Sequence, residues 1–179
     1  MGLFQIKTEC AGVVDDKKGG NESRNVASRL LGKFLDQHNL GDLGGGGATL
    51  RLLPKMVRTP DVLFIRWEKY PKGERPGEPI PDLVSDLAIE VLSEGNTRGE
   101  MQRKLKDYFL AGVELVWFVD PRKRTVQVFT APDQSNLLSE DDTLDGGAVL
   151  PGLRLPVRDV FARVPRLQRS TAKKRRSPG

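Results

Sequence analysis

Cysteine and histidine are almost absent from this chain of 179 residues. Cys10 is the only cysteine, which excludes an internal disulfide and a cysteine metal cluster. His38 is the only histidine, which argues against a zinc site and against Ser-His or Cys-His triads. A metal bound here would need oxygen ligands, so magnesium or manganese is the natural candidate.

Long apolar runs are absent as well. None approaches the roughly 20 residues that a membrane span requires, and residues 1–7 lack the apolar core of a secretory signal. We therefore expect a cytoplasmic protein with no membrane partner. The glycine run at 44–47 is not followed by Lys-Ser or Lys-Thr, so the sequence gives no support to nucleotide hydrolysis.

Basic charge is concentrated at the C-terminal end of the sequence. Of the 29 Lys and Arg residues, seven lie from Arg163 onward, where no acidic residue occurs, and this leaves 22 basic against 24 acidic residues elsewhere. Such a tail either contacts nucleic-acid phosphates or forms a disordered solubilising end. We expect a weakly ordered segment at 1–20, one domain at 21–162 and a basic disordered tail at 163–179.

Apolar residues at helical spacing predict two long helices. The stripe at residues 26–35 indicates an amphipathic helix with Asn21 as its N-cap and Gly41 as its stop. Residues 97–100 fit a capping box, and the helix that follows should end at Gly112.

Short apolar runs between turn signals predict the strands. They lie at 48–52, 61–65, 86–92, 113–119 and 125–129, followed by a turn and strand at 144–150 and a closing helix at 156–161. Residues 70–81 hold four prolines and two glycines and should form a surface loop. The strands at 86–92 and 113–119 should be parallel and joined by a right-handed crossover through the second helix. The core order is helix, three strands, helix, strand, with extra strands after it, which indicates an α/β fold.

Two acidic residues lie beside the buried strands. Glu90 interrupts an otherwise apolar run, and a strand that is apolar on both faces is normally buried on both. An unpaired carboxylate there would cost roughly several kcal/mol or would be protonated instead. Asp61 precedes a second apolar run. Two acids beside two buried strands favour a divalent metal and metal-assisted hydrolysis.

Lys104 is the third candidate. It lies three residues after Met101 and four before Tyr108, so it borders the apolar stripe of the second helix and can reach back to the strand before it. Two carboxylates and a lysine can bind a hard divalent ion, polarise a phosphoryl oxygen and position water. Structural roles stay open for each: a turn acid at Asp61, a dedicated partner for Glu90, and a packed stem for Lys104.

Two further acids remain open at this stage. Asp86 lies four residues before Glu90 on the same strand face, where it is either a supporting acid or the start of the strand. Glu22 either adds a carboxylate to the site or is an exposed acid in the first turn of a helix.

A series of short motifs runs in a specific order from Asn21 to Phe161. They are Pro60-Asp61-Val62, Asp86 to Ser93, Asn96-Thr97, Lys104-Leu105 with Tyr108, Ala111-Gly112-Val113, Val116 to Pro121, and Leu144 to Gly147 with Leu150-Pro151-Gly152. In this order they resemble the PD-(D/E)XK nuclease superfamily. More closely, they resemble its bacterial Uma-type family of restriction-endonuclease-like proteins, long catalogued as a domain of unknown function.

The resemblance implies a restriction-endonuclease-like mixed sheet flanked by helices, with Asp61 and Glu90 as metal-binding acids. The superfamily's basic motif has a lysine two residues after the acid, where this chain has Leu92, and the matching lysine of this family is Lys104. Relatives carry a histidine near the first helix, where this chain has residues 22–24 as Glu-Ser-Arg. Nucleic acid, in the first place DNA, is the implied partner, and a homodimer that cuts two strands is compatible with it.

The sequence therefore predicts an endonuclease that hydrolyses phosphodiester bonds in DNA with Mg²⁺ or Mn²⁺. Its catalytic residues would be Asp61, Glu90 and Lys104, and its metal ligands Asp61 and Glu90. The alternative is a non-catalytic module on the same fold that binds nucleic acid or a protein partner.

Overall fold

The structure is a computed structural model that describes residues 18–45, 50–53, 56–71 and 83–164. The predictions for residues 1–17 and for the tail beyond 164 lie outside these ranges, as does most of the predicted loop at 70–81. The elements in chain order are α1 (Lys18–His38), β1 (Gly41–Gly44), β2 (Leu50–Leu53), β3 (Met56–Arg58), β4 (Val62–Arg66), the 3-10 helix η1 (Trp67–Lys69), β5 (Leu87–Val91), α2 (Arg98–Ala111), β6 (Leu115–Asp120), β7 (Thr125–Ala131), β8 (Gln134–Leu138), β9 (Thr143–Asp145), β10 (Arg154–Pro156) and α3 (Val157–Val160).

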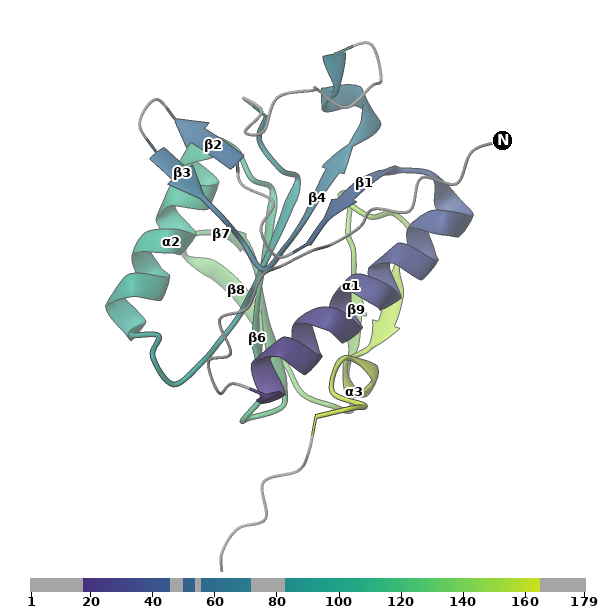
Figure 1. The fold of residues 1–179 in the computed structure, drawn as a ribbon, viewed down its shortest axis with the longest axis vertical. Coiled ribbons are helices and arrows are strands. Elements are labelled where there is room, and N and C mark those ends of the chain that lie inside the picture. Colours follow the sequence, from purple (N-terminus) through teal and green to yellow (C-terminus); the bar gives the residue numbers. More distant parts are fainter. Residues whose placement is uncertain (1–17, 46–49, 54–55, 72–82, 165–179) are drawn as a thin grey trace, which may run out of the picture.

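A six-stranded mixed sheet forms the middle layer, with strand order β1-β4-β5-β6-β7-β8. β5 and β6 are parallel, as predicted, and the other neighbours are antiparallel. Figure 1 shows α2 on one side of the sheet and α1 on the other. Along the chain, the sheet strands and the two long helices follow the order α1, β1, β4, β5, α2, β6, which reproduces the predicted core order. The predicted α/β fold class is confirmed.

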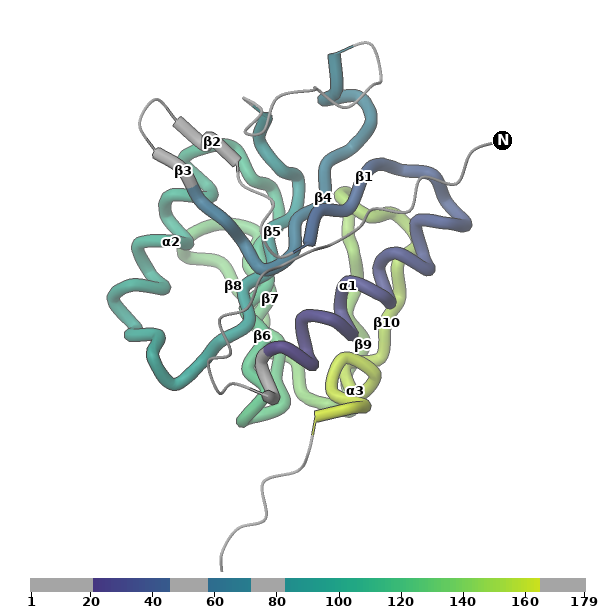
Figure 2. The backbone as a smooth tube through the Cα atoms, viewed as in Figure 1, coloured from purple at the N-terminus to yellow at the C-terminus, as the bar shows by residue number. Residues whose placement is uncertain are grey.

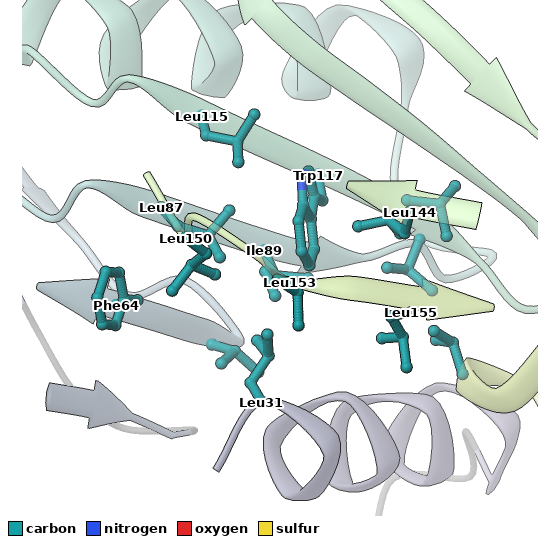
Figure 3. Packing of buried hydrophobic residues seen from close by; sticks show 14 of the residues in the cluster. Leu31, Phe64, Leu87, Ile89, Leu115, Trp117, Leu144, Leu150, Leu153 and Leu155 are labelled. Atoms are coloured by element: carbon teal, nitrogen blue, oxygen red, sulfur yellow. The ribbon is translucent and has the colours of Figure 1, made fainter. Parts of the chain in front are cut away.

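Each face of the sheet carries its own hydrophobic cluster. On the α1 side, Leu31 of the helix packs with Leu87 and Ile89 of β5 and with Trp117 of β6 (Figure 3). On the α2 side, Met101, Leu105 and Tyr108 pack against the alternate residues of the same strands, whose side chains point to the opposite face of the sheet. The alternation of β5 therefore turns Leu87 and Ile89 toward α1, and Ala88 and Glu90 toward α2.

The C-terminal elements close the α1 side. β9 and β10 form an antiparallel pair, and α3 follows β10 directly. Figure 2 shows α3 next to α1, although the two lie near opposite ends of the described chain, and the two helices are in contact. The predicted closing helix at 156–161 is thus present as α3.

Several predicted boundaries are wrong. α1 begins at Lys18, so Asn21 lies inside its first turn instead of capping it, and the helix ends at His38. Gly41 begins β1, which pairs with β4 and takes the place expected for the strand at 48–52. That segment is instead β2, which pairs only with β3 among the described strands. Near residue 145 the strand β9 comes before the glycines and not after them.

Candidate active site

The pairing of β4 with β5 brings the two predicted acids together. Val62 of β4 lies opposite Ile89 of β5 in antiparallel register, so the preceding residue, Asp61, lies opposite Glu90. The Asp61 carboxylate also accepts a hydrogen bond from the backbone N–H of Val91, at 2.8 Å from its Oδ2 atom. Asp61 is therefore anchored to the end of β5, next to Glu90.

Glu90 is held by two side chains of α2. Its Oε2 accepts from the Lys104 ammonium at 3.0 Å, and its Oε1 accepts from the Tyr108 hydroxyl at 2.6 Å. Lys104 and Tyr108 are four residues apart, which places them on one face of the helix. Glu90 is only 5% exposed, and this pair of donors satisfies a carboxylate that would otherwise be costly to bury.

The surroundings of Glu90 act on its protonation in opposite directions. Burial raises the pKa of Glu90 above its ordinary value, and the negative charge of Asp61 adds to this effect. The hydrogen bond from Tyr108 and the positive charge of Lys104 lower the pKa but do not cancel the effect of burial. Burial, followed by the nearby Glu90 carboxylate, also raises the pKa of Tyr108 far above its usual range, so its hydroxyl remains a proton donor.

Arg24 of α1 reaches the same site from the other helix. Its Nη1 atom lies 3.3 Å from Oδ1 of Asp61, and its guanidinium also donates to the side chain of Asn21. The side chains of Asp61 and Lys104 are 26% and 24% exposed. The site is therefore open to solvent beside these two residues, whereas Glu90 is buried at its inner end. On α2, Asp107 pairs with Arg58 from the end of β3.

The other acids that the sequence left open lie elsewhere. Asp86 is fully buried near the opposite end of β5, where it accepts from the backbone N–H of Arg66 at 2.8 Å and pairs with the ammonium of Lys69 at 2.9 Å. Its role is therefore structural. Glu22 lines a separate pocket with Arg29 and Arg163, and neither Asp61 nor Glu90 lines that pocket.

A groove of about 810 Å³ lies on the other flank of α2. Arg98 and Gln102 line it from the helix and Phe118 from β6, whereas Asp61, Glu90 and Lys104 do not line it. Leu92, which stands where the superfamily's basic motif has its lysine, also lines this groove. The motif lysine position thus has an apolar residue that packs against the α2-side cluster and lines this groove.

The structure gathers Asp61, Glu90 and Lys104 at one place and adds two residues that sequence reasoning missed. The sequence shows Tyr108 as part of the apolar stripe of α2 and of the motif with Lys104-Leu105, but no role was predicted for its hydroxyl, although its spacing from Lys104 could have revealed one. Arg24 lies in the segment 22–24, where relatives carry a histidine, but its contact with Asp61 was not predicted, because that contact depends on how α1 packs against β4. Within the described ranges no three His, Cys, Asp or Glu side chains gather closely enough to hold a metal ion.

The comparisons with known proteins agree with this architecture. A family model described as "Putative restriction endonuclease" (Uma2) matches residues 9–158. The crystal structure of a "putative nuclease" belonging to DUF820 from Anabaena variabilis ATCC 29413 superposes with a TM-score of 0.72 at 15% identity, with 88% of each chain covered. At this identity the match shows a common fold. No curated protein sequence gave a significant match.

No helix in the described part of the chain is long and apolar enough to cross a membrane. The six-stranded mixed sheet, the order of its elements and the family match over 150 residues, from 9 to 158, all agree with the motifs that the sequence displays. They support a nuclease-like function. The chain belongs to the Uma2 family, described as "Putative restriction endonuclease".

Proposed function

We propose that this protein is a magnesium-dependent endonuclease that hydrolyses phosphodiester bonds in DNA, with Asp61, Glu90 and Lys104 as its catalytic residues. The observation that carries the proposal is the buried Glu90, whose two oxygens are held by Lys104 and Tyr108 while Asp61 lies opposite it, directly before β4. A buried carboxylate beside a second acid, with a raised pKa, is typical of a functional site.

The donor set fits a hard divalent cation. Two carboxylates and no nitrogen or sulfur ligand suit Mg²⁺ or Mn²⁺. Mg²⁺ in particular retains several waters and is commonly bound through one or two carboxylates together with substrate phosphate. The pair formed by Asp61 and Glu90 therefore meets the requirement of such an ion without a third acidic side chain. Each oxygen of both carboxylates has a second lone pair beyond the hydrogen bonds described above.

Each residue of the site would have a separate role in catalysis. Asp61, fixed by the Val91 N–H, and Glu90 would hold the cation, which supplies Lewis-acid stabilisation of charge on the phosphoryl oxygens. Lys104 carries its ammonium to the exposed side of Glu90, where it would orient the attacking water or stabilise charge on the scissile phosphate. Tyr108 keeps the Glu90 carboxylate in one orientation from the buried side.

A second function is favoured by one observation: both acids are already paired with cations, Asp61 with Arg24 and Glu90 with Lys104. A non-catalytic module that binds nucleic acid or a protein partner would retain such pairs as structural contacts. Metal titration distinguishes the two. A nuclease binds Mn²⁺ and loses that binding in Asp61→Asn, whereas a binding module shows no metal dependence.

The decisive experiment is cleavage of supercoiled plasmid DNA with and without Mg²⁺, with RNA as a parallel substrate. Glu90→Ala should abolish cleavage because it removes a metal ligand. Lys104→Ala should slow it by at least about a hundredfold, the typical loss when a stabilising charge is removed from a reacting centre.

Lys106→Ala is the matched control, because Lys106 lies on the exposed side of the same helix. It should cleave like the wild type, and circular dichroism should show that all three variants fold. Equal activity in the wild type, Glu90→Ala and Lys104→Ala would remove the assignment.

A further inference from the structure

Arg24 is a cation that α1 contributes to the candidate site. We propose that Arg24 is an exchanging phosphate ligand: it neutralises Asp61 in the metal-free protein and turns to a phosphate of the nucleic acid once Asp61 holds a divalent cation. The inference rests on the proposed function, which does not assign a role to this residue.

The contact between Arg24 and Asp61 has the properties of an exchangeable pair. The Nη1–Oδ1 distance is 3.3 Å, whereas charge-assisted hydrogen bonds are typically about 2.7–2.9 Å. The two side chains are 30% and 26% exposed, and ion pairs with this much access to solvent contribute little to stability. Releasing the guanidinium therefore costs little.

Asp61 does not depend on Arg24 for its position. Its other oxygen, Oδ2, accepts from the Val91 N–H at 2.8 Å, which fixes the carboxylate to the backbone of β5. Arg24 has a second partner of its own, the side chain of Asn21 one turn earlier on α1. When the ion pair opens, the carboxylate stays in place and the guanidinium stays close to the site.

The charges show why an exchange is expected. In the metal-free protein the carboxylates of Asp61 and Glu90 are balanced by Lys104 and Arg24. A divalent cation on the two acids competes with the guanidinium for Oδ1 of Asp61 and leaves the site with two surplus positive charges. A phosphodiester supplies one negative charge toward this surplus, and the planar fork of an arginine matches phosphate geometry.

The test measures metal and nucleic acid separately in the wild type, Arg24→Ala and Arg24→Lys. Arg29→Ala serves as the charge-matched control, because Arg29 is exposed on the same helix. Binding of Mn²⁺ without nucleic acid is followed by electron paramagnetic resonance of the free ion. Arg24→Ala should bind Mn²⁺ about two- to fivefold more tightly than the wild type, since a competing partly exposed ion pair has been removed. Tighter binding would show that the guanidinium competes with the cation for Asp61, and the salt dependence of duplex binding then decides whether Arg24 meets a phosphate.

Affinity for a fluorescein-labelled duplex is then measured by anisotropy in Ca²⁺ at several salt concentrations. Arg24→Ala should bind more weakly, with a salt dependence smaller by about one phosphate contact, and Arg24→Lys should retain the wild-type slope. Arg29→Ala should match the wild type in the Mn²⁺ measurement and retain the salt slope.

The inference would be overturned if Arg24→Ala bound Mn²⁺ no more tightly than the wild type, or if its salt slope were unchanged. The proposed function would still stand if the wild type bound Mn²⁺ and cleaved DNA. A wild type that neither binds Mn²⁺ nor cleaves DNA overturns both. If circular dichroism shows that Arg24→Ala does not fold, Arg24→Gln is put through the same two measurements and the same outcomes decide.

Discussion

Glu90 combines deep burial with a negative charge, and the two work against each other. Its oxygens have donors in Lys104 and Tyr108, yet the net effect of the surroundings is to raise the pKa of its carboxyl group. The folded protein therefore holds this proton to a higher pH than the unfolded chain does. Ionising this carboxyl group costs free energy in the folded protein. An acid is kept at such a position when its charged form is needed for binding a cation.

The stability of a Glu90→Gln variant should reveal this cost. Because the pKa is raised in the folded state, ionisation of Glu90 lowers stability as the pH rises from its ordinary pKa of 4.5 through the raised value. At pH below 4.5 both states are protonated and the penalty vanishes. The melting temperature of Glu90→Gln relative to the wild type should therefore increase from pH 4 to pH 8, measured by circular dichroism with a chelator present.

Glu68→Gln is the control for this comparison, because Glu68 is exposed in η1. Its melting temperature should follow that of the wild type over the same range. A Glu90→Gln difference that stays constant, or that shrinks as the pH rises, would contradict the assigned direction of the shift.

Individual residues of the site differ in how visible they were in the sequence. Glu90 could be predicted because a lone acid breaks an apolar strand, and Asp61 because it precedes a similar run. Lys104 followed from helical spacing together with the family resemblance. The role of the Tyr108 hydroxyl could not be predicted, because the aromatic ring accounts for this residue as part of the core. Arg24 reaches Asp61 only through the packing of α1, which no local sequence pattern encodes.

At the scale of elements, α2 determines where the donors of Glu90 lie. Thr97 caps the helix by accepting from the backbone N–H of Glu100 at 3.2 Å. Gly112 ends it with a φ of 98°, in the left-handed region, while its N–H bonds back to the last turn. Both ends were predicted, because capping is encoded by residues adjacent in sequence.

Two alanine substitutions in and beside this helix should have opposite effects on stability. Gly112→Ala should lower the free energy of unfolding by about 1 kcal/mol, because a side chain disfavours a positive φ. Gly99→Ala adds a Cβ in ordinary contact with Arg103 and should raise stability by up to about 1 kcal/mol through its better helix propensity. Urea denaturation measures both. Equal effects of the two variants would contradict the assigned left-handed cap.

The elements that were missed are those with little to bury. β1 is a four-residue edge strand that contains two glycines, and β8, at the opposite edge, is largely exposed and polar. Edge strands gain their order from backbone pairing with a neighbour, here β4 and β7, and such pairing leaves no hydrophobic alternation in the sequence. The central strands β4, β5 and β6 are apolar because both of their faces are covered, and all three were predicted.

At the scale of the whole molecule, charge is unevenly distributed between residues 1–162 and the C-terminal segment from Arg163. The 22 basic and 24 acidic residues of the segment 1–162 leave that segment slightly acidic, so it should attract a polyanion only weakly at long range. The seven basic residues from Arg163 onward carry the surplus. If the protein acts on DNA as proposed, the long-range electrostatic attraction to DNA and the catalytic residues belong to different parts of the chain.

Removing residues 167–179 tests this division. The deletion takes away five basic residues and no acidic one. It keeps Val164, whose carbonyl oxygen accepts from Arg124 at 3.1 Å, so the contacts of the described domain are retained. Duplex affinity should fall, and the slope of log affinity against log salt should shrink by as much as about 4.5 if each residue contacts one phosphate. Mg²⁺-dependent cleavage at saturating DNA should be unchanged, because Asp61, Glu90 and Lys104 are untouched.

A variant of the full-length chain with the same five residues changed to glutamine separates charge from length. It should reproduce the smaller salt slope of the deletion, since counterion release depends on the number of positive charges that meet phosphates. The opposite reading is a solubilising tail, for which both variants would keep the wild-type slope and differ from it only in solubility. Anisotropy titrations over a range of salt concentrations decide between the two, because only direct contact with phosphates couples the tail's charge to the salt dependence of binding.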